Sequence, residues 1–148
     1  MTVKIYDSLP KEALDIRIEV FVSEQGFVDK PDETDKVATH MVMYDGDKAI
    51  ATCRMSKTDT PSTFLIGRIA VLKSLRGNGL GRQIIEEAEN HLRSIGADTA
   101  VIHSQLRARD FYVRCGYTVC SEIEYEQNYP HVWVRKSLNE AGKIKASE

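Results

Sequence analysis

The chain has 148 residues, of which 42% are hydrophobic and 28% are charged, and its formal net charge is −2. This length fits one compact domain, and the apolar fraction is too high for a chain that stays disordered. No apolar run reaches the roughly 18–20 residues of a membrane-spanning helix, and the balanced charge gives no general attraction to nucleic acid, so we expect neither partner.

The cysteines and the N-terminus indicate the compartment. Cys53, Cys115 and Cys120 are odd in number and irregularly spaced, which predicts neither a disulfide framework nor a zinc site. Free thiols fit a reducing compartment, and the N-terminus lacks the apolar stretch of a secretory signal, so we expect a cytoplasmic protein. No two histidines have metal-ligand spacing, and we therefore expect no metal.

The first half of the chain predicts one helix among four strands. Pro10 lies near a helix start, and apolar residues then recur at helical spacing until Gly26. An Asp-Gly pair at 45–46 indicates a hairpin turn between two strands. The predicted elements are a strand at 3–5, a helix over 8–26, an acidic loop at 29–35, and strands at 40–44, 49–55 and 64–72.

The second half predicts two helices among three strands. A long helix is expected to bury the face formed by Leu80, Ile84, Ala88, Leu92 and Ile95. Gly96 follows as the residue that ends it. The remaining predicted elements are a strand at 99–103, a helix at 108–115, and strands at 117–125 and 132–136.

The order of these elements, β-α-β-β-β-α-β-α-β-β, predicts an α/β (α+β) fold. Antiparallel strands followed by helix crossovers imply a mixed, mostly antiparallel central sheet of about seven strands, with helices on both faces. Residues 139–148 are polar and rich in lysine and glutamate. We therefore expect one domain over residues 1–138, followed by a polar C-terminal tail.

A glycine-rich loop is the most informative segment. Residues 76–81, Arg-Gly-Asn-Gly-Leu-Gly, follow an apolar strand and open an amphipathic helix, where free backbone amides fit a phosphate or pyrophosphate. A dinucleotide fingerprint would need glycine in place of Arg82 or Ile84, and a P-loop would need Gly-Lys-Ser/Thr, so neither is indicated. A glycine-rich turn without a ligand is the alternative.

Two motifs carry a resemblance to a known family. The segment from Arg76 to Gly81 resembles the acyl-CoA signature R/Q-x-x-G-x-G/A of the GNAT N-acetyltransferase superfamily. Residues 105–117 resemble its downstream pattern Asn-x-x-Ala-x-x-Phe/Leu-Tyr-x-x-x-Gly-Phe/Tyr, except that Gln105 stands where Asn is usual. The resemblance extends over about residues 1–138, and it implies the GNAT fold.

A third segment narrows the resemblance to one branch of that superfamily. Residues 17–27 resemble the R-x-x-V-F-x-x-E-Q-G segment of the branch that includes the bacterial YjcF-like and ElaA-like proteins. The acidic loop and His40 that follow also resemble that branch.

The resemblance implies an N-acetyltransferase that moves the acetyl group of acetyl-CoA to a primary amine of a small molecule, by direct attack in a ternary complex. The loop amides would bind the CoA pyrophosphate, and the pantetheine arm would pair with the backbone of Ile69 and Val71. An amide near Ala70 or Val71 would stabilise the oxyanion. The implied cofactor-binding residues are Ile69, Ala70, Val71, Arg76, Gly77, Asn78, Gly79, Leu80, Gly81, Arg82, Gln105, Ala108 and Phe111.

The resemblance also assigns catalytic candidates. Tyr112 occupies the position of the general acid that protonates the leaving thiolate, although a packing aromatic is the alternative. The strand before the loop lacks the Glu that many GNAT enzymes use as the base. Glu24 and His40 are the candidates for that role, with loop bracing and a simple structural hydrogen bond as their alternatives.

Other features concern the acceptor and the partners. Arg54 and Arg68 lie in predicted strands, so they would bind an anionic acceptor or else be solvated on the sheet. A non-catalytic acyl-CoA-binding regulatory module of the same fold is the alternative function, and a protein or peptide acceptor ranks below a small molecule. Residues 132–134 form either a core strand or an interface strand, which leaves a homodimer open.

Overall fold

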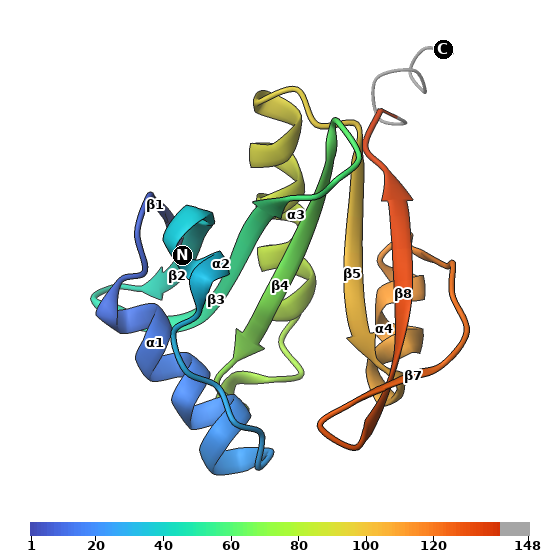
Figure 1. Ribbon diagram of the computed structural model, residues 1–148. Helices are drawn as coiled ribbons and strands as arrows, with labels where there is room; N and C mark the ends of the chain where they lie inside the picture. The colour runs from blue at the N-terminus through green and yellow to red at the C-terminus, as the bar shows by residue number, and fades with distance from the viewer. Residues whose placement is uncertain (140–148) are drawn as a thin grey trace. The chain divides into compact units, whose positions relative to one another are not determined.

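The computed structural model describes residues 1–139 (Figure 1). Its strands are β1 (Thr2–Tyr6), β2 (Thr39–Asp45), β3 (Lys48–Lys57), β4 (Thr63–Val71), β5 (Thr99–Gln105), β6 (Thr118–Val119), β7 (Glu124–Glu126) and β8 (Tyr129–Ser137). Its helices are α1 (Lys11–Arg17), the π-helix η1 (Ile18–Glu24), α2 (Glu33–Val37), the 3-10 helix η2 (Lys73–Leu75), α3 (Leu80–Ser94), the 3-10 helix η3 (Leu106–Ala108) and α4 (Arg109–Arg114).

The chain forms two compact units. The first unit comprises Met1–Ser56 and Ile66–Ala88, and the second comprises Lys57–Leu65 and the chain from Glu89 onward. Strand β4 and helix α3 contribute to both units, because each crosses a boundary between them.

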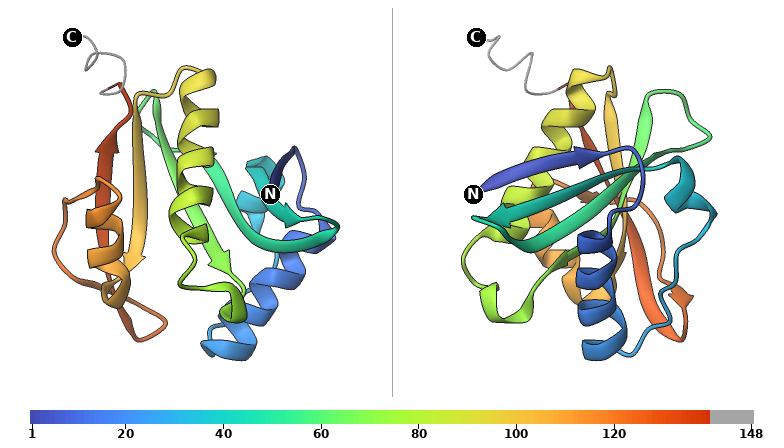
Figure 2. Two further views of the ribbon diagram at one scale, coloured as in Figure 1. Left: turned by 180° about the vertical axis from the view of Figure 1, so that it is seen from behind. Right: turned by 90° about the vertical axis from the view of Figure 1, so that its left-hand side faces the viewer.

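In the first unit the strands follow the order β1-β2-β3-β4. β1 pairs antiparallel with β2 from Thr2↔Tyr44 to Tyr6↔His40, and β2 forms an antiparallel hairpin with β3. α1 lies in front of these strands in Figure 1 and the start of α3 lies behind them, and Figure 2 shows the reverse when the chain is seen from behind. The unit is therefore covered on both faces.

Two apolar clusters hold α1 and η1 against the strands. Ile16 and Val20 pack with Ala70 and Leu72 near the end of β4. One turn earlier, Ala13 packs with Val42 and Tyr44 of β2. The burial of these side chains anchors the helix whose C-terminal end carries Glu24.

In the second unit β5 is central. The start of β4 pairs parallel with β5 from Thr63↔Thr99 to Leu65↔Val101, and β8 pairs antiparallel with the other edge of β5. β6 and β7 both pair antiparallel with β8. α4 packs against β5 and β8. Because β8 has hydrogen-bonded neighbours on both sides and Val132 and Val134 are buried, the segment 132–134 is part of the core of this unit.

These observations confirm the predicted fold class, a mixed and mostly antiparallel sheet with helices. Leu80, Ile84, Ala88 and Leu92 are buried as expected, but Ile95 lies beyond the end of α3 and is 52% exposed, so its predicted burial is wrong. The predicted tail lies outside the described residues apart from residue 139.

Two further predictions need correction. The predicted acidic loop contains α2, whose start is stabilised by a capping box in which Asp32 and Asp35 each accept the other's backbone amide. The predicted strand 117–125 is divided into β6 and β7, and the hairpin that joins β7 to β8 turns at Gln127 and Asn128. Both of these residues have positive φ, as a two-residue type I′ turn requires. Among residues 1–139, no helix combines the length and the apolar character needed to cross a membrane.

Candidate active site

The glycine loop joins η2 to the first turn of α3 in the first unit. Gly77 and Gly79 have φ values of +87° and +78°, which side chains rarely adopt, and a Cβ on either glycine would meet no heavy atom within 4 Å. The loop backbone is therefore specific for glycine and open on that side. α3 is 15 residues long, so its first amides and its dipole favour an anion here. The expected pyrophosphate contacts of residues 76–82 fit this geometry.

Hydrogen bonds from Arg76 link the glycine loop to the C-terminal end of η1. Its Nη1 and Nη2 donate to the two carboxylate oxygens of Glu24 at 2.5 and 2.8 Å, and its Nε donates to the carbonyl of Val71 at 3.0 Å. The fork of a guanidinium matches a carboxylate in this bidentate way. One side chain thus joins η1, β4 and the glycine loop, and both oxygens of the candidate base Glu24 accept hydrogen bonds from it.

Strand β4 is irregular just before its predicted cofactor-binding residues. Arg68 has a φ of +50°, which is uncommon for a residue other than glycine. After it, Ala70 is buried in the cluster below α1 and Val71 is also buried, while the side chain of Ile69 is only partly covered. A residue in this conformation inside a strand marks a break in regular pairing, and such breaks concentrate at functional sites.

A buried network lies beside this strand. The Arg–Asp network consists of Arg17, Asp29, Asp32, Asp35, Arg54 and Arg68. At its centre, Arg17 is 1% exposed and donates to Asp29 through Nε and Nη2, both at 3.0 Å, and to Asp35 through Nη1 at 2.8 Å. The three guanidinium groups balance three carboxylates, so the formal charges of the network cancel.

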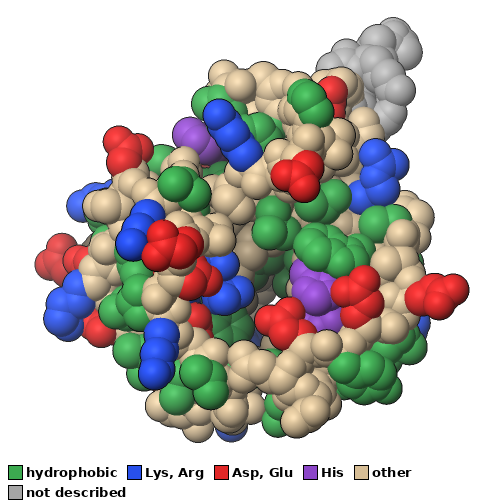
Figure 3. Space-filling model, in the orientation of Figure 1, with side chains coloured by type: hydrophobic (Ala, Val, Ile, Leu, Met, Phe, Trp, Pro, Cys, Tyr) green, Lys and Arg blue, Asp and Glu red, His purple; other side chains and the backbone are tan. Residues whose placement is uncertain are grey.

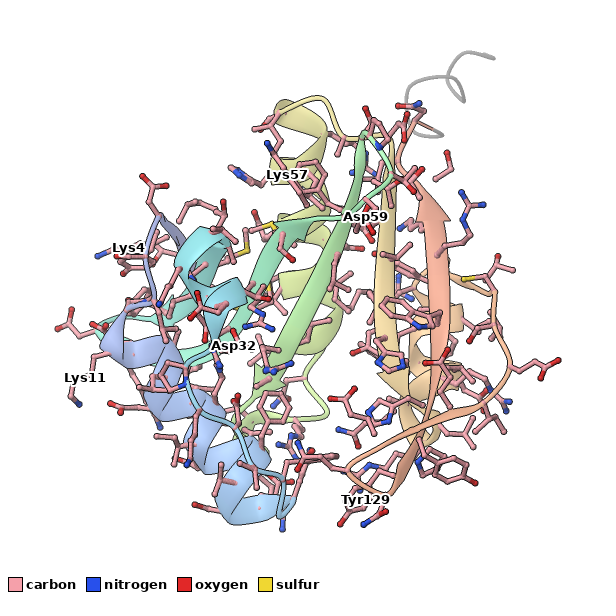
Figure 4. All side chains as sticks on the ribbon, in the orientation of Figure 1. Lys4, Lys11, Asp32, Lys57, Asp59 and Tyr129 are labelled. Atoms are coloured by element: carbon pink, nitrogen blue, oxygen red, sulfur yellow. The ribbon has the colours of Figure 1, made fainter. Side chains whose placement is uncertain are left out.

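The predicted acceptor residues belong to this network. Arg54 Nη1 donates to Asp32, which is labelled in Figure 4, and to Asp35, at 2.8 Å each. Arg68 Nε donates to Asp29 at 3.2 Å, and its Nη2 lies 3.5 Å from Asp32. The Arg54 side chain is 8% exposed and that of Arg68 is 32% exposed, so Arg68 is the more accessible of the two. Their substrate-binding roles stay predictions.

The network also accounts for shifted proton affinities. Burial alone would raise the pKa of Asp35, but hydrogen bonds from Arg17, from the backbone amide of Asp32 and from Arg54 outweigh it and lower that pKa well below the ordinary value. Burial likewise opposes the raised pKa of Arg17, which its bonds to Asp29 and Asp35 produce. Both groups are therefore charged at neutral pH.

The second candidate base lies against the same network. His40 is 1% exposed, and its Nε2 lies 3.0 Å from the backbone carbonyl of Asp35. Because a carbonyl only accepts, this geometry fits a Nε2 that carries the proton and donates it. The contacts of Glu24 and His40 are those of groups that hold their surroundings in place, and their roles as bases stay predictions.

The downstream motif lies in the second unit. Tyr112 of α4 is 9% exposed and lies edge-to-face with Phe111 and Tyr117, at ring distances of 5.2 and 6.3 Å. Gln105 ends β5 and accepts from Arg107 at 2.9 Å, and Ala108 precedes α4 as its N-cap residue. These contacts place the motif on the β5–η3–α4 connection.

A buried hydrogen bond fixes the end of this motif. Tyr117 donates its hydroxyl to Glu89 at 2.7 Å, and Lys136 donates to the other oxygen of Glu89 at 2.9 Å. Burial and the nearby carboxylate raise the pKa of Tyr117, so it stays a neutral donor.

One cluster was not predicted as part of the site. His103 of β5 lies between the carboxylates of Glu124 and Glu126 of β7, and its ring stacks on Trp133 of β8 at 4.5 Å. His103 is the last residue of the strand predicted at 99–103. The alternation Glu124–Tyr125–Glu126 is a weak signal for two carboxylates on one face of a strand. Among residues 1–139, no three His, Cys, Asp or Glu side chains are arranged to hold a metal ion.

Comparisons with known proteins agree with the two motifs. The model of the acetyltransferase (GNAT) family matches residues 5–117. The chain is 35% identical over 129 residues to the uncharacterized N-acetyltransferase YjcF of Bacillus subtilis strain 168, with 85% of this chain and 91% of YjcF covered. The expected YjcF-like and ElaA-like branch is thereby confirmed.

Solved structures give the same result for the fold. A candidate N-acetyltransferase from Lactobacillus plantarum is similar with a TM-score of 0.83 and 31% identity, over 93% of this chain and 99% of that one. A Bacillus subtilis acetyltransferase in complex with CoA is similar with a TM-score of 0.69 and 22% identity, over 91% of this chain and 97% of that one. At that identity the second likeness shows the fold alone.

Proposed function

The chain belongs to the acetyltransferase (GNAT) family, and on this premise we propose that it transfers the acetyl group of acetyl-CoA to a primary amine of a small molecule. The observation that carries the proposal is the glycine loop at the N-terminus of α3, with its positive φ values and open glycine faces. A fold neighbour solved in complex with CoA supports the choice of cosubstrate.

Each predicted residue then has a physical task. The amides of residues 76–82 bind the pyrophosphate, and the backbone of Ile69 and Val71 pairs with the pantetheine arm. An amide near Ala70 or Val71 stabilises the negative charge that develops on the thioester oxygen during attack. Gln105, Ala108 and Phe111 line the cofactor as the family motif implies.

The leaving group needs a proton, and Tyr112 supplies it in this proposal. An ordinary phenol has a pKa of about 10 and a thiol one of about 8.5, so the transfer to a forming thiolate is uphill but feasible. The edge-to-face contacts with Phe111 and Tyr117 limit the movement of the Tyr112 ring. A cytoplasmic setting, expected from the cysteine content of the sequence, is part of the proposal.

The test is a thiol-release assay with acetyl-CoA and a panel of small amines, run on the wild type and on Tyr112→Phe. Acetyl-CoA binding is measured beside it by calorimetry. We expect acceptor-dependent release of CoA in the wild type and a kcat about a hundredfold lower in the variant, with unchanged acetyl-CoA affinity.

Tyr112→Phe keeps the ring and its edge contacts, so a loss of kcat reports on the hydroxyl. Tight acetyl-CoA binding without release for any amine would overturn the enzymatic proposal in favour of a regulatory acyl-CoA-binding module. A variant with full kcat would overturn the role of Tyr112 alone.

A further inference from the structure

The His103 cluster, defined as His103, Glu124, Glu126 and Trp133, lies entirely in the second unit. Its atoms are close together: Nδ1 of His103 lies 3.2 Å from Glu126 Oε1, and Nε2 lies 3.4 Å from Glu124 Oε1. Figure 3 shows imidazole surface with carboxylate surface on either side, next to hydrophobic side chains.

Neighbouring aromatic rings hold the orientation of the His103 imidazole. Its ring stacks on Trp133 with ring centres 4.5 Å apart, and the ring of His131 lies 4.9 Å away on β8. His131 is itself held, because its Nδ1 lies 2.9 Å from the carbonyl of Tyr129. These aromatic contacts, both from β8, leave the two ring nitrogens of His103 as its polar edges.

One of those nitrogens makes no hydrogen bond. Nε2 of His103 is buried and has no hydrogen-bond partner among the described residues, since its approach to Glu124 lacks hydrogen-bond geometry. Buried polar atoms in proteins are nearly always paired, so an exception indicates a partner that the protein itself does not supply.

The chemistry of the missing partner follows from the atoms around it. In the neutral imidazole, a proton on Nδ1 faces Glu126, and then Nε2 and the Glu124 carboxylate are two acceptors that face each other. A partner with two or more N–H or O–H donors satisfies both, and the negative charge of the carboxylates favours a cationic one. If the ring is instead protonated, two carboxylates still face one positive charge. Either state favours a cation, and an ammonium has three donors.

The carboxylates are also accessible from outside. The side chains of Glu124 and Glu126 are 54% and 49% exposed, and residues two apart on a strand point to the same side. His103 also lies two residues before Gln105, where β5 leads into the connection that carries Tyr112.

We propose that the His103 cluster binds the acceptor of the reaction as an alkylammonium cation and that His103 removes its proton. This proposal rests on the proposed function. It gives the role of general base to His103 in place of the candidates Glu24 and His40. The acceptor class is a strongly basic primary alkylamine, whose pKa is about 10.4 and which is therefore charged near neutral pH.

The proton and bond changes balance. One proton passes from the ammonium through the exposed carboxylate of Glu124 to the buried Nε2 of His103, which lies 3.4 Å from it, and Glu124 and Glu126 stabilise the resulting imidazolium. The neutral amine attacks the acetyl carbon, the C–N bond forms and the C–S bond breaks. Tyr112 protonates the sulfur and regains a proton from the nitrogen, and His103 releases its proton to solvent. The products are the N-acetylated amine, the CoA thiol and one proton.

The test compares two probes, pentylamine and methoxyamine, the second of which is neutral near neutral pH. In His103→Gln we expect kcat/KM for pentylamine to fall about a hundredfold, and for methoxyamine to fall much less, because that amine needs no deprotonation. A merely structural role of His103 would lower both values equally.

Variants of the two carboxylates test whether the His103 cluster binds the ammonium group. The double variant Glu124→Gln/Glu126→Gln should raise KM for pentylamine about fivefold or more, while Glu122→Gln in the same segment leaves it unchanged. Glu122 is a matched control because it is exposed and two residues before Glu124.

The outcomes separate the two proposals. If the wild type binds acetyl-CoA but acetylates neither probe nor any other amine, the proposed function fails and this inference fails with it. If the wild type acetylates pentylamine and the His103 and glutamate variants match the Glu122 control, only the His103 assignment is overturned.

Discussion

The Arg–Asp network of the first unit and the His103 cluster of the second use the same kinds of charged side chains in opposite ways. In the network, three guanidinium groups face three carboxylates, and Arg17 is 1% exposed. In the cluster, two half-exposed carboxylates face one imidazole whose Nε2 has no hydrogen bond. Buried charges that are fully paired are costly to separate, whereas unbalanced and accessible charge is suited to a ligand.

The largest expected effect on stability comes from removing the central cation of the Arg–Asp network. Arg17→Met leaves Asp29 and Asp35 buried with one guanidinium partner fewer each, and we expect it to lower the free energy of unfolding by about 3–5 kcal/mol. Urea denaturation measures the loss.

The control is Lys11→Met, which removes an exposed ion pair with Asp15 (Figure 4). Solvent screens such a pair, so its removal should change the free energy of unfolding far less than Arg17→Met does. Equal losses in the two variants would contradict the distinction between a buried network and a surface pair.

The Arg–Asp network should also make the stability of the protein depend on pH through Asp35. The folded-state pKa of Asp35 is lowered, so its contribution is fully present above the ordinary carboxyl pKa of about 4 and is lost as the pH falls toward the folded value. In Asp35→Asn the free energy of unfolding should fall less steeply below about pH 4, by up to about 1.4 kcal/mol per pH unit.

Chemical denaturation at several acidic pH values measures that slope. Asp15→Asn, at an exposed pair, should keep the slope of the wild type. Parallel curves for the wild type and Asp35→Asn would show that Asp35 gains no stability from its partners.

The smallest expected effect concerns the pair beside the glycine loop. Glu24→Gln removes the charge that fixes Arg76, and both side chains are partly exposed, so a loss of about 1 kcal/mol or less is expected. Acetyl-CoA affinity should fall by up to about fivefold, with kcat nearly unchanged.

Calorimetry and steady-state kinetics separate these two quantities for Glu24→Gln. A large loss of kcat with unchanged acetyl-CoA affinity would instead assign Glu24 as the base.

Local patterns made much of the fold predictable. The Asp-Gly turn, the helical spacing after Leu80 and the glycine loop each depend on neighbouring residues, and the structure has all three. Ile95 fits the helical spacing, but it follows the last residue of α3 and is exposed. The division of 117–125 into β6 and β7 depends on pairing with β8, which no local pattern contains.

The polar clusters were not predictable for the same reason. Arg54 meets Asp32 and Asp35 across about 20 residues of sequence, and His103 meets Glu124 and Glu126 across a similar separation. Residue types alone therefore leave two roles for Arg54 and Arg68, which are binding an anionic acceptor or solvation on the sheet. In the structure both arginines donate hydrogen bonds to carboxylates of the Arg–Asp network. Glu124 and Glu126, by contrast, face a single imidazole.

The measurement that tests the comparison most directly is the KM for pentylamine in Glu126→Gln and Asp32→Asn, each in the otherwise intact chain. The two carboxylates are similarly exposed, at 49% and 40%, but Glu126 faces the imidazole and Asp32 is bound by Arg54. We predict a KM raised about threefold to fivefold in Glu126→Gln and unchanged in Asp32→Asn. A KM raised in Asp32→Asn and unchanged in Glu126→Gln would place the acceptor at the Arg–Asp network instead of the His103 cluster.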